Sequence, residues 1–168
     1  MYIGTEQGLF IYDSSDGILK PFEARTSYLV TISSPVTKLL ATGELLMVGT
    51  CGQGFFVYDT VAGTLVQNSI GMPYVTDLVR ADDGSIYLSE ESTGIYDVSK
   101  RGDIKSHILS RRGVSGMSIH DAELYYICRD EPDIIGLVSE TEKLEKQLTE
   151  QTIATDMARL DLDRTTDL

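Results

Sequence analysis

The fold is decided by the phrase Gly49-Thr50-Cys51-Gly52-Gln53-Gly54-Phe55-Phe56-Val57-Tyr58-Asp59. Its run from Phe55 to Tyr58 presents apolar or aromatic residues to both faces of a strand. A strand with one face in water alternates apolar and polar residues, whereas a strand buried on both faces reads as a continuous apolar run. Gly52 and Gly54 favour a tight turn before the run, because glycine tolerates positive φ. The phrase therefore predicts a turn and a strand whose sheet is covered on both sides.

The same phrase recurs along the chain. Gly4-Thr5-Glu6-Gln7-Gly8-Leu9-Phe10-Ile11-Tyr12-Asp13 has one residue fewer, the segment Leu88 to Asp97 keeps the closing Gly…Tyr-Asp, and Tyr126 to Ser139 is a degenerate version. A second phrase begins at Val36, Val75 and Val114, which are spaced 39 residues apart. A further step of 39 residues reaches Ile153. Two phrases that keep a common period indicate stacked structural repeats.

Each period reads as four short strands separated by turns. In the second repeat we expect strands at residues 36–41, 45–50, 54–58 and 64–68. Four antiparallel strands that recur about every 40 residues are typical of a propeller blade. The sequence therefore predicts an all-β fold, a β-propeller of about four four-stranded blades.

The first and last repeats are incomplete in complementary ways. Residues 1–27 supply the second to fourth strands of a blade, whereas a surplus first strand lies at residues 152–160. We expect this C-terminal strand to complete the N-terminal blade, because closing a ring removes exposed strand edges. The expected units are 1–27 plus 152–160, 28–70, 71–110 and 111–151, which make up the propeller 1–160, followed by a tail at 161–168.

Two architectures remain open at this point. The chain closes alone into a four-blade ring, which we favour, or it forms part of a seven- or eight-blade ring completed by a second copy in a homodimer or by another propeller segment. Residues 139–152 contain good helix formers, but the repeat register favours a turn and a fourth strand there.

The phrase from Tyr2 to Asp13 resembles the blade repeats of two-component-regulator-type propellers, in which an aromatic or aliphatic residue, Gly-Thr, a short turn with glycine and aromatic-x-Tyr-Asp follow one another. It is also similar to the opening of citron-homology domains, which are propellers of trafficking and signalling proteins. WD-repeat proteins have a similar period, but their Gly-His and Trp-Asp pairs are absent here. The resemblance implies a recognition or scaffolding role and places no family active-site residue on this sequence.

Charge and composition exclude several classes of function. The net charge of −12 and the lack of a Lys/Arg stripe disfavour nucleic-acid binding, whereas basic protein surfaces are compatible partners. No apolar run is long enough for a membrane span. Because no signal segment is visible at the N-terminus, we expect a cytoplasmic protein with Cys51 and Cys128 as reduced thiols.

The sequence shows no catalytic constellation, and we expect no enzyme activity, no cofactor and no metal. His107 and His120 are expected at the surface rather than in a base role. Asp77 and Asp156 align to within one position in their repeats, which would direct both carboxylates toward a central channel. Hard cations take six or more oxygen ligands, so this pair does not predict a metal site.

The expected function is that of a non-enzymatic protein–protein interaction scaffold. Loops on a rigid framework carry function more often than the framework itself. We therefore predict partner contacts at acidic, turn-rich positions, which are Asp82, Asp83, Glu90, Glu91, Asp130 and Glu131. The alternatives are a small-ligand sensor module and a lactonase- or hydrolase-like propeller enzyme.

Overall fold

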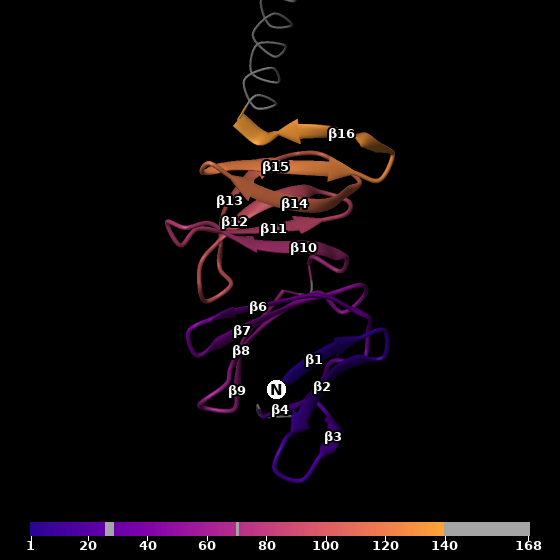
Figure 1. The fold of residues 1–168 in the computed structure, drawn as a ribbon, viewed down its shortest axis with the longest axis vertical. Helices are drawn as coiled ribbons and strands as arrows, with labels where there is room; N and C mark the ends of the chain where they lie inside the picture. The colour runs from indigo at the N-terminus through magenta and orange to yellow at the C-terminus, as the bar shows by residue number, and fades with distance from the viewer. Residues whose placement is uncertain (26–28, 70, 140–168) are drawn as a thin grey trace, which may run out of the picture.

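A computed structural model describes residues 1–25, 29–69 and 71–139 of the chain. These residues form small sheets stacked along the long axis of the molecule, with the N-terminal sheet at one end and β16 at the other (Figure 1). The strands are β1 Tyr2–Thr5, β2 Gly8–Asp13, β3 Ile18–Pro21, β4 Glu23–Arg25, β5 Leu29–Thr31, β6 Val36–Thr42, β7 Leu45–Thr50, β8 Phe55–Asp59, β9 Thr64–Ser69, β10 Val75–Arg80, β11 Ile86–Glu90, β12 Gly94–Val98, β13 Ile104–Leu109, β14 Val114–His120, β15 Glu123–Cys128 and β16 Glu131–Leu137.

The strands group into four repeating antiparallel units, which we call blades. Blade 1 is β1–β2–β3, blade 2 is β6–β7–β8–β9, blade 3 is β10–β11–β12–β13, and blade 4 is β14–β15–β16. The predicted four-stranded pattern is confirmed in blade 2, where β7 has the predicted bounds and the other strands agree to within one residue. A turn and a fourth strand of blade 4 were expected at residues 139–152. Val138 and Ser139 have helical backbone, and residues 140–152 lie outside the described residues.

A short hairpin, β4–β5, was not predicted. It extends blade 2 to a six-stranded sheet through one parallel pairing, Arg25 opposite Thr64. Phe22 and Ala24 anchor the hairpin and are 1% and 0% exposed. The sequence does carry a signal for it: the interval from Gly8 to Gly54 is six residues longer than the interval from Gly54 to Gly94.

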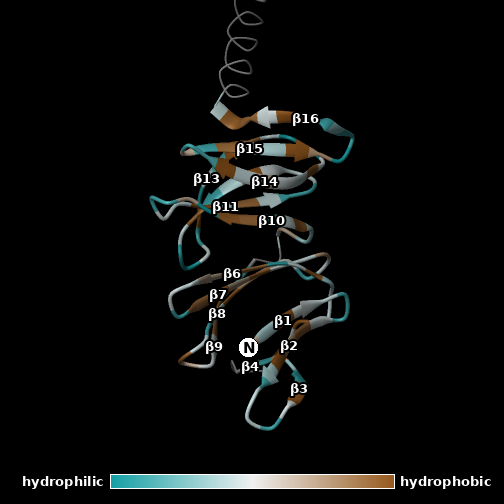
Figure 2. Cartoon of the chain, in the orientation of Figure 1, coloured by the Kyte–Doolittle hydropathy of each residue, from teal (hydrophilic) through white to brown (hydrophobic). Residues whose placement is uncertain are grey.

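The two sequence phrases recur together because their residues touch across the blade interfaces. A Cβ on Gly4 would lie 2.5 Å from Cγ1 of Val36, and a Cβ on Gly49 would lie 2.6 Å from Cγ1 of Val75. The glycine of each Gly-Thr pair thus admits the first-strand valine of the following blade. Figure 2 shows the apolar residues along the strands and the polar residues in the turns between them.

The inner strands of blades 2, 3 and 4 are also joined by one buried carboxylate. Oδ1 of Asp77 in β10 forms an ion pair with Nζ of Lys38 in β6 at 2.8 Å. Oδ2 of Asp77 accepts a hydrogen bond from the backbone N–H of Met117 in β14 at 2.9 Å. Asp77 is only 8% exposed. A buried charge is tolerated when it is paired and hydrogen-bonded, as it is here.

The described residues do not confirm the closed four-blade ring. They form an open stack in which blades 1 and 4 lie at opposite ends (Figure 1), and β1 pairs only with β2. The C-terminal strand expected at 152–160, which would complete blade 1, lies outside the described residues.

The glycine–valine contact gives a first prediction. Gly49→Ala should lower the free energy of unfolding by about 1–3 kcal/mol, because the new methyl group overpacks the space that Val75 occupies. Gly71→Ala is the matched control, since a Cβ on Gly71 would meet no atom within 4 Å apart from its chain neighbours. Urea unfolding measures both variants.

Val75→Ala has a cost of its own, because Val75 is 1% exposed in the core. On that background Gly49→Ala should lower the free energy of unfolding by less than it does in the unaltered chain, because the added methyl group no longer meets the valine side chain. Equal urea midpoints for the Gly49→Ala and Gly71→Ala variants would contradict the proposed contact.

Candidate interaction site

The predicted contact residues lie at opposite ends of the strands. In blade 3, Val75 pairs with Glu90 at one end of the β10–β11 ladder, and Arg80 pairs with Ile86 at the other. The turn that carries Asp82 and Asp83 therefore lies at the end away from Glu90. A second turn, between β15 and β16, lies at the Glu90 end, because Cys128 pairs with Val114 there. We call this end the linker end, since the blade-to-blade linkers also run there.

Backbone hydrogen bonds tie the linker end together. The N–H groups of Cys51, Glu91 and Arg129, which hold equivalent positions in three blades, donate to the residue before their own inner strand at 2.7–3.0 Å: to Pro35, Tyr74 and Gly113 respectively. The linker of one blade is also bonded to the turn of its neighbour, as in Gly113 N–H to the carbonyl of Glu91 at 2.7 Å. The side chains at this end are therefore mounted on a connected base.

Glu90 is part of that base rather than of the exposed surface. It is 2% exposed, and its Oε2 accepts hydrogen bonds from the backbone N–H groups of Ser92 and Thr93 and from the Thr93 hydroxyl, at 2.8–3.0 Å. Its Oε1 is buried without a partner among the described residues. Thr50 performs the matching task in blade 2, where its hydroxyl donates to the carbonyl of Gly54. We therefore correct the prediction for Glu90, because burial removes it from contact with a partner.

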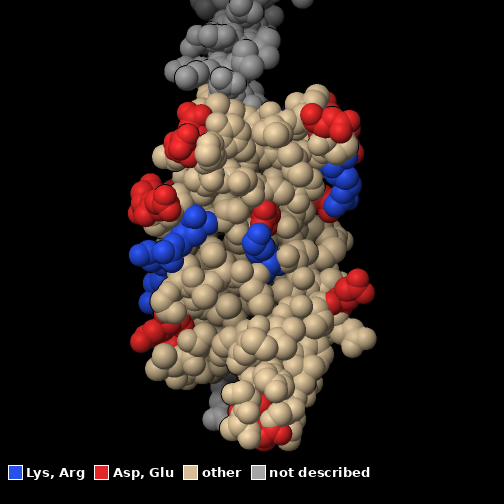
Figure 3. Space-filling view, viewed as in Figure 1, with Lys and Arg blue, Asp and Glu red and all other residues tan. Residues whose placement is uncertain are grey.

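Glu91, Asp130 and Glu131 do lie together at the linker end. Glu91 forms an ion pair with Arg129, and Glu131 forms one with Arg111. Exposed ion pairs contribute little stability, so their main effect is to orient these side chains. On the face shown in Figure 3, charged side chains gather along the two edges of the stack, where the strands end.

Two hollows adjoin at this end and share Ser92 and Arg112. One, of about 420 Å³, is lined by Tyr74, Glu91, Arg129 and Asp130 as well, and the other, of about 460 Å³, extends toward His107. Arg112 and Asp130 are exposed. No hydrogen bond or ion pair engages the side chain of either residue within residues 1–25, 29–69 and 71–139. Within the described residues, this hollow therefore presents an exposed guanidinium and an exposed carboxylate beside the ring of Tyr74.

Sequence analysis did not predict the ion pairs that Arg111 and Arg129 form at this site. Arg129 stands 38 residues after Glu91 in the equivalent turn, and opposite charges at equivalent positions of adjacent repeats are the signal that predicts their ion pair. The guanidinium of Arg111 donates to the thiol of Cys128 at 3.3 Å, and this hydrogen bond raises the pKa of Arg111.

Asp82 and Asp83 form a separate exposed turn at the other end of blade 3. The backbone N–H of Ser85 donates to Asp83 at 2.8 Å, and this hydrogen bond is the main reason that the pKa of Asp83 is lowered. The structure therefore does not bring these two residues together with Glu91 or Asp130.

Other groups with potential chemistry are engaged in structural contacts. Asp77 is held by Lys38 and two backbone N–H groups, and His107 stacks on Tyr96 with ring centroids 4.3 Å apart. Asp156 lies outside the described residues. In the part of the chain that the structure describes, no group of three or more His, Cys, Asp or Glu residues is placed to hold a metal ion. The same part contains no helix with the length and apolar character needed to cross a membrane.

Known structures share this fold at low sequence identity, whereas no protein-family model and no curated protein sequence matches the chain. The chain is similar to the extracellular domain of the putative one component system BT4673 from B. thetaiotaomicron, with 15% identity and a TM-score of 0.56 over 76% of this chain and 20% of that one. It is similar to the computationally designed Ika4 protein, with 14% identity and a TM-score of 0.58 over 81% and 82% of the two chains. BamB from Moraxella catarrhalis gives 14% identity and a TM-score of 0.53 over 77% and 38%.

These similarities show the fold alone. The BT4673 domain and BamB are propellers, so the chain has an all-β fold of the β-propeller type. The chain spans about a fifth of the BT4673 domain.

The role of Glu90 gives a second prediction. Glu90→Ala should lower the free energy of unfolding by about 1–2 kcal/mol, because two backbone N–H groups and one hydroxyl lose their acceptor. Glu91→Ala is the neighbouring control and should change stability by less than about 0.5 kcal/mol, since its ion pair is exposed. Thermal or urea unfolding measures both, and a Glu90→Ala variant as stable as Glu91→Ala would refute the structural role.

Proposed function

We propose that the chain is a non-enzymatic protein-interaction module that binds its partner at the linker end of blades 3 and 4. The observation that carries this proposal is that two exposed residues of unlike charge, Arg112 and Asp130, line the same hollow of about 420 Å³. Because both signs of charge are present, the matching surface on the partner also carries both, whereas net charge alone indicated only that basic protein surfaces are compatible partners.

The rigidity of the base supports this role. Association costs less when the binding groups are already ordered. Here the turn at Glu91 is bonded to the linker at Gly113, and that linker is bonded in turn to Arg129. Ion pairs hold Glu91 and Glu131 in place, and Tyr74, which is 44% exposed, offers an aromatic contact of the kind enriched at interfaces.

A charge-balanced double variant gives the third prediction. Arg112→Glu combined with Asp130→Lys leaves the net charge unchanged and reverses both free charges of the site. We expect recovery of the specific partner to fall about tenfold, which corresponds to about 1.4 kcal/mol of binding free energy. The measurement is affinity capture with cross-linking from the cells that produce the protein, quantified by mass spectrometry.

The control reverses two exposed charges at the opposite end of the strands, Asp82→Lys with Arg101→Glu, and also keeps the net charge. This variant should recover the same proteins as the unaltered chain. If the two double variants recover identical sets of proteins in equal amounts, the linker end is not the binding site.

A further inference from the structure

Each blade has two faces, and the internal interfaces show which residues cover them. Each of β2, β8 and β12 has an apolar residue directly after the glycine of the preceding turn, and this residue packs against the following blade. These residues, Leu9, Phe55 and Ile95, are 1%, 1% and 0% exposed. The equivalent residue of blade 4 is Ile135, because it pairs with Ile127 as Phe55 pairs with Gly49. Ile135 is 71% exposed. The same repeat position is therefore buried in blades 1 to 3 and open in blade 4.

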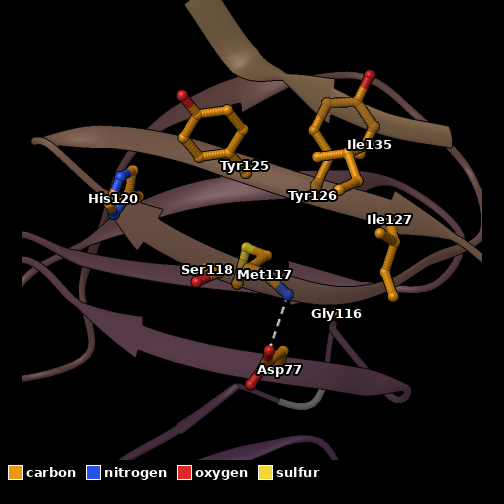
Figure 4. Close-up of a pocket in the computed structure, with 9 residues that line it drawn as sticks. All are labelled: Asp77, Gly116, Met117, Ser118, His120, Tyr125, Tyr126, Ile127 and Ile135. Carbon is orange, nitrogen blue, oxygen red and sulfur yellow. Dashed lines mark hydrogen bonds between the residues drawn. The ribbon is translucent and has the colours of Figure 1, made fainter.

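The open face of blade 4 is apolar and hollowed. Tyr125, Ile127 and Ile135 from β15 and β16 line a hollow of about 560 Å³ that reaches Met117 and Asp77 at its inner edge (Figure 4). An exposed apolar surface of this kind indicates an interaction site in proteins that otherwise bury such residues.

In blade 1 the open face is the one that packs against the preceding blade in the other repeats. In blade 2, the residues that pack against the preceding blade include Val48, Phe56 and Tyr58, which are 0%, 2% and 7% exposed. Their equivalents in blade 1 are Ile3, Phe10 and Tyr12, which are half-buried, and the adjoining Leu19 is 51% exposed. One chain therefore carries both halves of a blade–blade interface, each without a partner within the described residues.

The two open faces also fit at the position that Gly4 and Gly49 hold in blades 1 and 2, and that Ser89 holds in blade 3. There, the inner-strand valine of the following blade fills the space above Gly4 or Gly49. Blade 4 has Ile127 at this position, so its own side chain occupies that space and a docking blade has no need of an inner strand. In the described residues blade 1 has no inner strand beside β1. Ile127 therefore matches blade 1 better than it would match a four-stranded blade.

We propose that the open face of blade 4 binds the open face of blade 1 in a second copy of this chain, so that two copies close head to tail into one ring of eight blades. Within one chain the two faces lie at opposite ends of the stack (Figure 1), which places the partner face on another molecule. Two identical head-to-tail contacts related by a twofold axis close a ring and leave no face open. The inference stands independently of the linker-end site, which lies at the strand ends and not on the sheet faces.

The mass of the full chain in solution tests this proposal. Sedimentation velocity should give twice the 18.5 kDa mass of one chain. Ile135→Glu should raise the dissociation constant about a hundredfold or more, because each of the two contacts would bury an unpaired carboxylate. Leu19→Glu should do the same from the other face. Val61→Glu is the matched control, since Val61 is 73% exposed in the β8–β9 turn, and this variant should remain a dimer.

Mixing the two single-face variants distinguishes this pairing from other dimers. The Ile135→Glu chain keeps an intact blade 1 face and the Leu19→Glu chain keeps an intact blade 4 face, so the mixture should form heterodimers at concentrations where each variant alone is monomeric. Circular dichroism verifies that all variants remain β-folded. A monomeric unaltered chain, a dimer that Ile135→Glu leaves intact, or a mixture that stays monomeric would each overturn the proposal.

Discussion

The stacking of blades 1, 2 and 3 depends on one steric contact, in which the first-strand valine of a blade packs against a bare glycine on the second strand of the preceding blade. At Gly4 and Gly49 a β-carbon would lie within 2.6 Å of that valine, so the sheets approach more closely than side chains on both strands would permit. Close approach lets each strand bury residues on both faces, as Phe55 and Phe56 do at 1% and 2% exposure. No sheet of four strands could hide both faces alone, so the blades are stable because they are stacked.

Stacking by repetition has a consequence at the two ends. Every internal blade covers one face of its neighbour, but the last blade leaves Ile135 open, whereas the equivalent Leu9, Phe55 and Ile95 are buried. The first blade leaves Leu19 open, whereas the equivalent Leu65 of blade 2 is partly buried against the core that blades 1 and 2 share. Extended apolar faces are costly to leave in water and prone to unspecific association. The fold type therefore requires something at each end, and the proposed second copy satisfies both ends by the same contact.

The linker end shows how a repeat separates structural from exposed polar groups. At the position where the second strand ends, Thr5 and Thr50 donate to the carbonyl of the glycine that follows the turn, whereas Glu90 accepts from the backbone of its own turn. One residue further on, Cys51, Glu91 and Arg129 use their backbone for the framework and leave their side chains outside. Adjacent acidic residues such as Glu90 and Glu91 thus have opposite roles, one in the framework and one on the surface.

The sequence by itself determined the strand pattern, the turns and the repeat, because apolar runs, glycines and a fixed spacing are local or periodic properties that survive in a single chain. Val36, Gly49 and the run at Phe55 predicted the strand bounds in blade 2 to within one residue. The tertiary structure alone decided which side of each turn faces water, so the burial of Glu90 and the pairing of Glu91 with Arg129 were not predicted. It also decided that blades 1 and 4 stand apart, because the curvature of a stack depends on the summed angles between sheets, which no residue pattern encodes directly.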